Sequence, residues 1–363
     1  MSRLRWVLEM VETSRYLNKR KVYVTFAGGA SIDRGLEAGV EIMQRKYAFI
    51  VNPASGAGEG AQIAAMLMRI VKDHPRLGEG EAAVFTVDRL SEDEMISLIS
   101  ESEMLIAVGG DGTVSQLISR MMQSKRTPAL GVVPVGTSND LARALGAPLR
   151  ADFTDDRVLR ATIDRLLSAR PILLDILAIN GRFFFCNYFS MGFDAIIVSD
   201  FAQMRKSRWI RLLPRGRFVN NLIYFLMGVK NAGFRLSPPV VVSIEYSGAE
   251  KRLTFDQPVR AVIVTNLPVY AGGTRINPGA RLDDGRFEIT VVETLFQFII
   301  VILTRFLRFL TLPRGIVQVR AERAEIQLHG PAPCQIDGEA AFDALSADHL
   351  LKITRWGSIR IAV

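Results

Sequence analysis

From Tyr47 onward, short apolar runs alternate with glycine-rich loops and amphipathic segments. Residues 47–60, YAFIVNPASGAGEG, combine an apolar run with such a loop, and a helix is expected over 61–71. AAVFTV at 82–87 indicates a second strand, and an acidic stretch after it opens a helix. The order strand, glycine loop, helix recurs at 105–122 and at 130–146. This alternation predicts a parallel sheet with its loops at the carboxyl ends of the strands.

After Pro171 the pattern changes to short strands separated by turn residues. Two strand-like runs are joined by Asn180-Gly181, which is a strong hairpin signal. Several further alternating runs follow without helices between them, which indicates antiparallel pairing. We therefore expect a basic extension over 1–46, an α/β domain with a parallel sheet over 47–170, and a largely antiparallel domain over 171–363.

Composition narrows the classes of protein that remain. The chain has 363 residues, enough for two domains, and 45 Lys and Arg against 37 Asp and Glu give a formal charge of +8. That surplus suits an anionic partner without selecting one. The two cysteines stand far apart and the three histidines do not cluster, so a zinc site, a disulfide framework and a histidine-dependent triad are not expected. A reducing compartment follows.

The apolar segments predict a cytosolic protein that touches a membrane. The N-terminus lacks the features of a signal peptide, and the most apolar segment, 295–312, is interrupted by Gln297, Arg305 and Arg308. On a helical wheel this segment has a wide apolar face, which either packs inside the protein or enters lipid. We favour the core or an acyl-chain pocket, because an exposed face this wide would aggregate.

Three glycine-rich loops, each between a strand and a helix, carry the candidate chemistry. Their main-chain N–H groups and the helix N-termini can cradle phosphate. NPASGAG alone does not establish a phosphate site, because an ordinary tight turn has the same kind of sequence. GGDGT at 109–113 is more specific, because Asp111 beside a phosphate calls for a cation such as Mg²⁺ between them. The alternative is a turn in which Asp111 caps its helix. Neither the P-loop motif nor the dinucleotide-binding motif is present.

Six segments in order resemble the diacylglycerol kinase and sphingosine kinase family of lipid kinases. They are FIVNPASGAG, AVGGDGTV, VVPVGTSNDLARALG, NYFSMGFDA, INPGARLDDGRFEITVVE and QIDGEA, and they cover roughly residues 46–345. GGDGT alone also occurs in NAD kinases and phosphofructokinases, but its combination with the other segments is specific. The resemblance implies an α/β nucleotide-binding domain, a β-sandwich lipid-binding domain, and phosphoryl transfer from ATP with Mg²⁺ to a lipid alcohol.

The resemblance also implies roles for individual residues. Around ATP it places Asn52, Ser55, Gly56, Thr86, Gly109, Gly110, Gly112, Thr113, Thr137, Asn139 and Asp140. Asp111 would be catalytic, and Asp284 with the main-chain oxygens of Arg281 and Arg286 would hold a structural Mg²⁺. Glu339 would be the general base on the lipid hydroxyl; without the resemblance, its DGE sequence is typical of a surface turn.

Two features depart from the family pattern. Where the family commonly has Asn-Glu after GGDGT and one further residue, this chain has Ser115-Gln116, so a metal contact there is in doubt. The extension before Tyr47 is not part of the family core.

The expected partners are a lipid and a membrane surface. Segment 205–217, RKSRWIRLLPRGR, has six basic residues, no acidic one, and interleaved apolar side chains. It suits peripheral binding to anionic headgroups at the inner face of the membrane, or it is a solvated loop. Diacylglycerol is the first acceptor, with ceramide or a sphingoid base second. NAD kinase and a catalytically silent membrane-binding module are the alternatives. No nucleic-acid partner is expected, and the oligomeric state is open, a homodimer included.

Overall fold

Four parallel strands form one end of the larger of the two main sheets. The computed structural model describes residues 46–363 apart from 78–79, 125, 150, 207–216, 308–311, 342–344 and 346–347. The parallel strands, in the order β2-β1-β3-β4, are β1 (Tyr47–Val51), β2 (Ala82–Thr86), β3 (Met104–Gly109) and β4 (Ala129–Pro134). The predicted parallel sheet is confirmed. Most of the basic extension and most of segment 205–217 lie outside the described residues.

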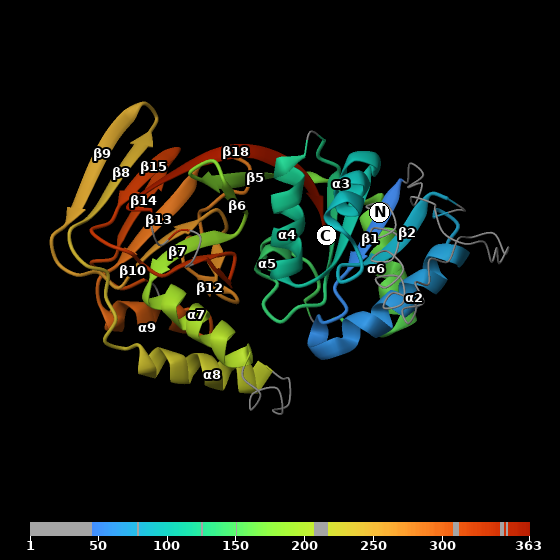
Figure 1. Cartoon of the computed structure of the whole chain (residues 1–363), viewed down its shortest axis with the longest axis horizontal. Helices are drawn as coiled ribbons and strands as arrows, with labels where there is room; N and C mark the ends of the chain where they lie inside the picture. Colours follow the sequence, from blue (N-terminus) through green and yellow to red (C-terminus); the bar gives the residue numbers. More distant parts are fainter. Residues whose placement is uncertain are drawn as a thin grey trace, which may run out of the picture. The chain divides into compact units, whose positions relative to one another are not determined.

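Helices alternate with these strands and cover the sheet (Figure 1). They are α2 (Glu59–Asp73), α3 (Glu92–Glu101), α4 (Asp111–Gln123), α5 (Asp140–Ala144) and α6 (Asp156–Ser168), with a short 3-10 turn at Gly56–Gly58. The acidic stretch does open a helix, because Ser91 and Glu94 form a capping box before α3. Apolar side chains of the strands pack into a core on each face of the sheet.

The larger sheet continues with strands from after residue 170. The long strand β18 (Leu350–Ala362) pairs parallel with β4 and antiparallel with β5 (Ile172–Ile179). It also pairs with β15 (Arg323–Gln327), and the sheet ends with β8 (Val240–Tyr246) and β9 (Ala249–Phe255). Hydrogen bonding is therefore continuous from the first half of the chain into the second half.

The Asn180-Gly181 hairpin forms as the sequence predicts. The turn connects β5 to β6 (Phe183–Phe185), and the two strands pair antiparallel. Asn180 and Gly181 both have positive φ, at 51° and 65°, which the tight hairpin turn requires. Asn180 Oδ1 also accepts a hydrogen bond from the main-chain N–H of Lys352, which ties the turn to β18.

A second sheet is wholly antiparallel and packs on the extension of the first. Its strands, in the order β14-β13-β10-β7-β16-β17, are β7 (Tyr188–Gly192), β10 (Ala261–Thr265), β13 (Phe287–Val292), β14 (Val317–Ala321), β16 (Cys334–Ile336) and β17 (Glu339–Ala340). Buried side chains of both sheets share one apolar core; Phe189 and Ile289 of this sheet meet Ile326 and Ile353 of the first. The predicted α/β sheet with a second, antiparallel sheet is confirmed.

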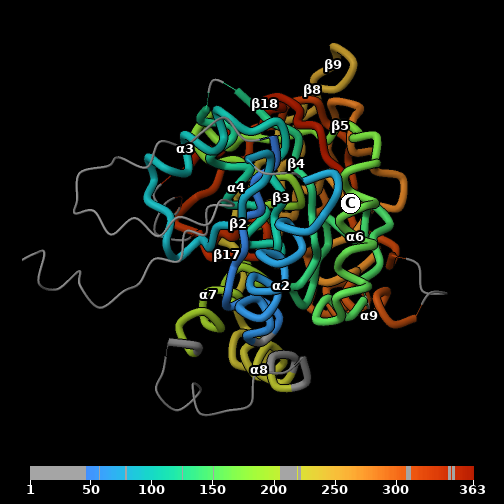
Figure 2. The backbone as a smooth tube through the Cα atoms, turned by 90° about the vertical axis from the view of Figure 1, so that its right-hand side faces the viewer, coloured from blue at the N-terminus to red at the C-terminus, as the bar shows by residue number. Residues whose placement is uncertain are grey.

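Three helices lie beneath the second sheet. α7 (Phe193–Lys206), α8 (Arg217–Lys230) and α9 (Leu295–Leu303) gather at one end of the described unit in both views (Figures 1 and 2). α9 is shorter than the predicted helix, and its buried residues are Phe298 and Val301. Among the described residues, no helix is both long enough and apolar enough to cross a bilayer.

The expectation that the apolar face of 295–312 is packed inside the protein is wrong for four of its residues. Phe296, Ile299, Phe306 and Leu307 are exposed, with Phe296 keeping 68% of its surface. Apolar residues surround this helix on nearly every side, so the wheel alone does not select the buried face. Contacts with the neighbouring elements select Phe298 and Val301 instead.

Candidate functional site

The carboxyl ends of β1, β3 and β4 bring the three glycine-rich loops together. Asn52, directly after β1, donates from Nδ2 to Thr113 Oγ1 at 3.0 Å. A Cβ on Gly136 would lie 2.4 Å from Cα of Gly110. The second and third loops can meet this closely because both positions are glycine. A Cβ on Gly109 would likewise lie 2.5 Å from Thr113 Oγ1, which packs the second loop on its own helix.

The first loop depends on glycine for its shape. Gly56 and Gly58 have positive φ, at 62° and 109°, and Ser55 stands in extended backbone before them. The carbonyl of Ser55 accepts from the main-chain N–H groups of Gly58 and Gly60. A Cβ on Gly60 would lie 2.2 Å from the carbonyl oxygen of Asn52. The loop thus folds tightly over the end of β1, as a phosphate cradle requires.

Asp111 links two of the loops. It is the first residue of α4, and its Oδ2 accepts from the main-chain N–H of Asp140 at 3.1 Å. Its Oδ1 faces the N–H of Leu141 at 3.5 Å. Asp111 therefore contacts the N-terminus of α5, while the N-cap of its own helix is Gly110. Burial, together with the carboxylate of Asp140, raises the pKa of Asp111 to about 7.

Asp140 joins the third loop to the second half of the chain. Its Oδ2 accepts from the main-chain N–H of Gly272 at 2.6 Å, in the turn between β11 (Val269–Tyr270) and β12 (Thr274–Arg275). Burial raises the pKa of Asp140, and the Gly272 N–H and the Arg143 guanidinium oppose that rise. The Arg143 Nε lies 3.7 Å from Asp140 Oδ1.

Asn139 supports this loop from behind. Its Nδ2 donates to the main-chain oxygens of Pro134 and Gly136 at 2.9 and 2.7 Å. Its φ of 50° is left-handed, a conformation that asparagine tolerates better than most residues. Thr137 is exposed on the same loop.

Three buried polar atoms at the predicted ATP contacts lack a hydrogen-bond partner among the described residues. They are Thr86 Oγ1, Asn139 Oδ1 and Asp140 Oδ1. Native structures rarely leave buried polar atoms unsatisfied, and the exceptions mark a function or a missing ligand. Their position around the loops fits a polar ligand at this place.

The DGE turn is anchored by Asp337. Its carboxylate accepts from the main-chain N–H groups of Cys186, Asn187 and Tyr188 at 3.3, 2.9 and 3.0 Å. Burial raises the pKa of Asp337, while these amides and the Ser115 hydroxyl oppose the rise. Asp337 itself has a φ of 48°. The left-handed backbone of Asp337 and the donors around its carboxylate fix the direction of the turn.

The turn brings Glu339 against the GGDGT loop. A Cβ on Gly112 would lie 2.7 Å from Glu339 Oε1, so the carboxylate is in contact with the start of α4. Ser115, on the next turn of α4, hydrogen-bonds Asp337. Gln116 beside it is exposed. Two residues that lie more than 200 positions apart, Gly112 and Glu339, are thus neighbours.

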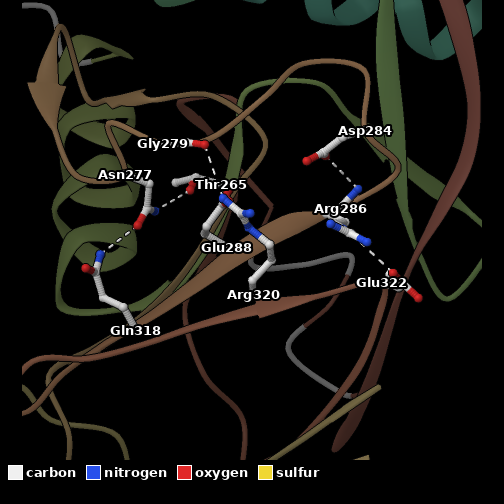
Figure 3. A network of polar contacts seen from close by, with 9 residues as sticks. All are labelled: Thr265, Asn277, Gly279, Asp284, Arg286, Glu288, Gln318, Arg320 and Glu322. Carbon is white, nitrogen blue, oxygen red and sulfur yellow. Dashed lines mark hydrogen bonds and ion pairs between the residues drawn. The ribbon is translucent and has the colours of Figure 1, made fainter. Parts of the chain in front are cut away.

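Asp284 lies among a different set of residues. Its Oδ1 accepts from the main-chain N–H of Arg286 at 3.1 Å, and the Arg286 side chain pairs with Glu322 at 3.2 Å (Figure 3). Arg281 pairs with Asp283 at 3.7 Å. A cavity of about 380 Å³ opens here, lined by Glu245, Asp284, Gly285, Glu322, Arg323, Thr354 and Arg355.

The donors around Asp284 suit a hard cation in part. Mg²⁺ takes oxygen ligands, commonly one or two carboxylates, and keeps several waters. The Asp284 carboxylate supplies one such ligand. Within the described residues, no group of three or more His, Cys, Asp or Glu is placed to hold a metal. The carboxylate suits Mg²⁺, and water would have to supply most of its coordination.

The loop that carries Asp284 is held at both ends. Buried Asp175 on β5 accepts from the N–H of Gly285 at 2.7 Å. At the other end, Asn277 donates to Thr265 Oγ1 at 2.7 Å and accepts from Gln318 at 2.6 Å (Figure 3). Across the sheet, Arg320 pairs with Glu288 at 3.0 Å and donates to the carbonyl of Gly279. These contacts place Asp284 by hydrogen bonding rather than by apolar packing.

Several residues of the site were not predicted to belong to it. Gly272 donates to the predicted site residue Asp140, and Asp337, bonded to Ser115, anchors the turn that carries Glu339. Tyr188 is buried next to the DGE turn, and its Oη lies 3.3 Å from where a Cβ on Gly338 would be. Only the AGG run at 271–273 gives a hint in the sequence, because two glycines mark a turn.

Comparisons with known proteins agree with this architecture. The diacylglycerol kinase catalytic domain matches residues 46–170, and the diacylglycerol kinase accessory domain matches residues 184–340. The diacylglycerol kinase of Bacillus subtilis strain 168 is 29% identical over 254 residues, covering 66% of this chain and 72% of that protein. That of Staphylococcus carnosus strain TM300 is 27% identical over 254 residues, covering 69% and 74%.

Solved structures show the same fold. A crystal structure of a diacylglycerol kinase from Bacillus anthracis strain Sterne has a TM-score of 0.54 at 17% identity, over 87% of this chain and 96% of that one. Another crystal structure from that strain has a TM-score of 0.57 at 20% identity, over 87% and 97%. The two family matches, over the parallel sheet and over the antiparallel strands, place the chain among the lipid kinases. The chain belongs to the diacylglycerol kinase family, whose members use ATP.

Proposed function

We propose that this enzyme transfers the γ-phosphate of ATP to the hydroxyl of diacylglycerol in a Mg²⁺-dependent reaction that gives phosphatidic acid. The observation that carries the proposal is the contact between Glu339 and Gly112. It puts a carboxylate from the accessory half beside the glycine loop expected to hold the transferred phosphate. An acceptor hydroxyl between Glu339 and that loop would face both a base and the γ-phosphate.

Phosphoryl transfer depends mainly on positioning and on neutralising charge, so the roles divide simply. Main-chain N–H groups of the Ser55–Gly56 and Gly109–Thr113 loops hold the phosphates. Glu339 accepts the proton of the lipid hydroxyl while the oxygen of that hydroxyl bonds to the γ-phosphorus. The bond between the γ-phosphorus and the bridging oxygen of the β-phosphate breaks, which releases ADP. Asn52, Thr86 and Asp140 line the nucleotide.

Magnesium would be held in two places. Asp111 faces the phosphate loop, and Asp284 with main-chain oxygens of Arg281 and Arg286 forms a structural site. When bound, Mg²⁺ neutralises charge that develops on the phosphate oxygens. Asp111 meets this need because its carboxyl is buried beside Asp140, where a nearby cation would favour the ionised form.

The acceptor is tested directly with labelled ATP. The pure protein is incubated with diacylglycerol, ceramide and sphingosine in mixed micelles, and the labelled lipids are separated. We expect labelled phosphatidic acid. Preferential labelling of ceramide or sphingosine would replace the proposed acceptor, and no labelled lipid under conditions where a known diacylglycerol kinase labels its substrate would indicate a catalytically silent module.

We further propose that the enzyme binds peripherally to the anionic cytoplasmic face of a membrane through segment 205–217. Each basic residue near such a surface is worth about 1 kcal/mol, and salt screens it. Replacing Arg208, Arg211 and Arg215 with Glu should weaken binding to anionic vesicles at low salt and spare activity on a short-chain, water-soluble diacylglycerol. Unchanged vesicle binding would remove the segment from the interface.

A further inference from the structure

The exposed apolar side chains are concentrated on two neighbouring helices. Fifteen large apolar side chains are exposed in the described part of the chain, and nine of them lie on α8, on α9 or on the turn after α9. We call these nine the α8–α9 face: Leu222, Tyr224, Phe225, Leu226, Val229, Phe296, Ile299, Phe306 and Leu307. Phe225, Phe296 and Phe306 each keep about two thirds of their surface, at 66%, 68% and 66%.

This exposure follows from the way the helices pack. Ile223 and Met227 of α8 and Phe298 and Val301 of α9 enter one buried cluster beneath the second sheet. The residues between them in each helix must then point away from the sheet. Of α7, α8 and α9, α8 lies farthest from the second sheet in Figure 1. An apolar patch of this kind marks a surface that binds something.

The two segments that carry this face contain basic residues and no acidic ones, although Asp200 of α7 pairs with Lys230 of α8. Residues 205–230, which contain α8, carry seven Lys or Arg and no Asp or Glu. Residues 295–321, which contain α9, carry four and again no acidic residue. The chain has 45 basic and 37 acidic residues in all, so 34 basic and 37 acidic residues lie outside these two segments. The positive surplus of the protein therefore belongs to the segments that carry its exposed apolar face.

Only a partner that is both apolar and anionic complements such a face. A second copy of the chain would bring two acid-free segments against each other. The extension over 1–46 has nine basic and five acidic residues, so its net charge has the same sign. An anionic bilayer offers acidic headgroups at its surface and acyl chains directly below them.

The face is connected to the candidate site through α7. α7 contacts β16 and β17, the strands that flank the DGE turn. It is fixed to α8 by a stacked pair of rings, Phe201 and Tyr224, with centroids 4.1 Å apart, and by an ion pair between Asp200 and Lys230. A bilayer seated on α8 would therefore lie on the side of the accessory half that carries Glu339.

We propose that the α8–α9 face inserts into the boundary between headgroups and acyl chains of an anionic bilayer. The proposal rests on the proposed lipid kinase function, and it adds an apolar docking surface that segment 205–217 does not contain. Phe225 and Phe296 enter the acyl region, while the surrounding arginines and lysines stay among the headgroups. The docked enzyme then meets its acceptor without extracting it into water.

The test compares Phe225→Asp combined with Phe296→Asp against the control Ile96→Asp. Ile96 is 52% exposed on α3 and lies outside the face, so the control makes the same chemical change elsewhere. Binding to mixed phosphatidylcholine–phosphatidylglycerol vesicles is measured by sedimentation without ATP. We expect at least about a tenfold loss for the double variant, since burying one aromatic side chain is worth more than that. The control should bind like the parent.

Two results would overturn the proposal: parental vesicle binding by the double variant, or an equal loss in the control. A parental dimer that the double variant abolishes, with vesicle binding intact, would assign the face to a second copy instead. Activity on a short-chain, water-soluble diacylglycerol tests the proposed kinase function separately from the proposed membrane docking. All forms should phosphorylate it equally, which also shows that they are folded. If the parent does not, the proposed function fails while the vesicle measurement still stands.

Discussion

Replacing Asp111 with Asn should stabilise the nucleotide-free protein at pH 8 while nearly abolishing its kinase activity. Burial and Asp140 raise the pKa of Asp111 from 3.8 to about 7. The folded state therefore keeps a proton that the unfolded chain has already released, and stability falls as pH rises from about 4 to about 7. A difference of that size corresponds to at most about 4 kcal/mol. The amide of Asn keeps the shape and an accepting oxygen without the charge.

Urea unfolding of both proteins at pH 5 and pH 8, without nucleotide or Mg²⁺, measures this effect. At pH 5 we expect the variant to be more stable by about 1 to 2 kcal/mol, because the folded carboxyl of Asp111 is neutral while that of the unfolded chain is already mostly ionised. At pH 8 this difference should rise to about 4 kcal/mol. Equal loss of stability at both pH values would refute the reasoning. It would mean that the Asp111 carboxylate is ionised and stabilises α5 through its bonds to the Asp140 and Leu141 amides.

Three further predictions concern the same machinery. Glu339→Gln should lower kcat by about 10²- to 10⁴-fold with little change in KM for ATP, and a change confined to that KM would make Glu339 a nucleotide contact. Ser115→Ala removes the hydroxyl on Asp337 and should lower kcat by about tenfold, while Ser115→Asn, the residue common in the family, restores it; equal activity of all three forms would leave Ser115 without a role. Asp284→Ala should abolish the rise in melting temperature on adding Mg²⁺, and an unchanged rise would exclude the site.

The parallel sheet and the glycine loops could be predicted because their signals are local. Each strand, loop and helix follows within about thirty residues of the last, and the Asn180-Gly181 turn specifies its own hairpin. The pairing of Ile361 with Leu130, which carries the sheet past residue 170, joins residues more than 200 positions apart. β18 is recognisable as a strand from its alternating pattern, but its own sequence does not indicate which strands it pairs with.

In the candidate site, too, residues with a local sequence signal could be predicted and residues that act through long-range contacts could not. The resemblance to lipid kinases supplied Asp111, Asp140 and Glu339 as expectations, and the fold brings all three to the glycine loops. Asp337 was part of the DGE motif but received no role of its own, because most of its partners are main-chain amides, which carry no residue-specific signal. Gly272 is the same case, since its contribution is one N–H group. Backbone donors can be assigned only after the loops are placed in space.

The three buried aspartates explain why the site needs both halves of the chain. Asp111 lies close enough to Asp140 and Asp337 for their charges to raise its pKa, and burial raises the pKa of all three. Such a cluster destabilises the fold unless donors offset it. Two of those donors cross between the halves: the main-chain amide of Gly272 in the accessory half donates to Asp140, and the side-chain hydroxyl of Ser115 in the nucleotide half donates to Asp337. These hydrogen bonds thus stabilise the buried carboxylates and also hold Glu339 against Gly112. The same contacts therefore determine the negative charge that a Mg²⁺-bound nucleotide would neutralise and the position of the proposed base.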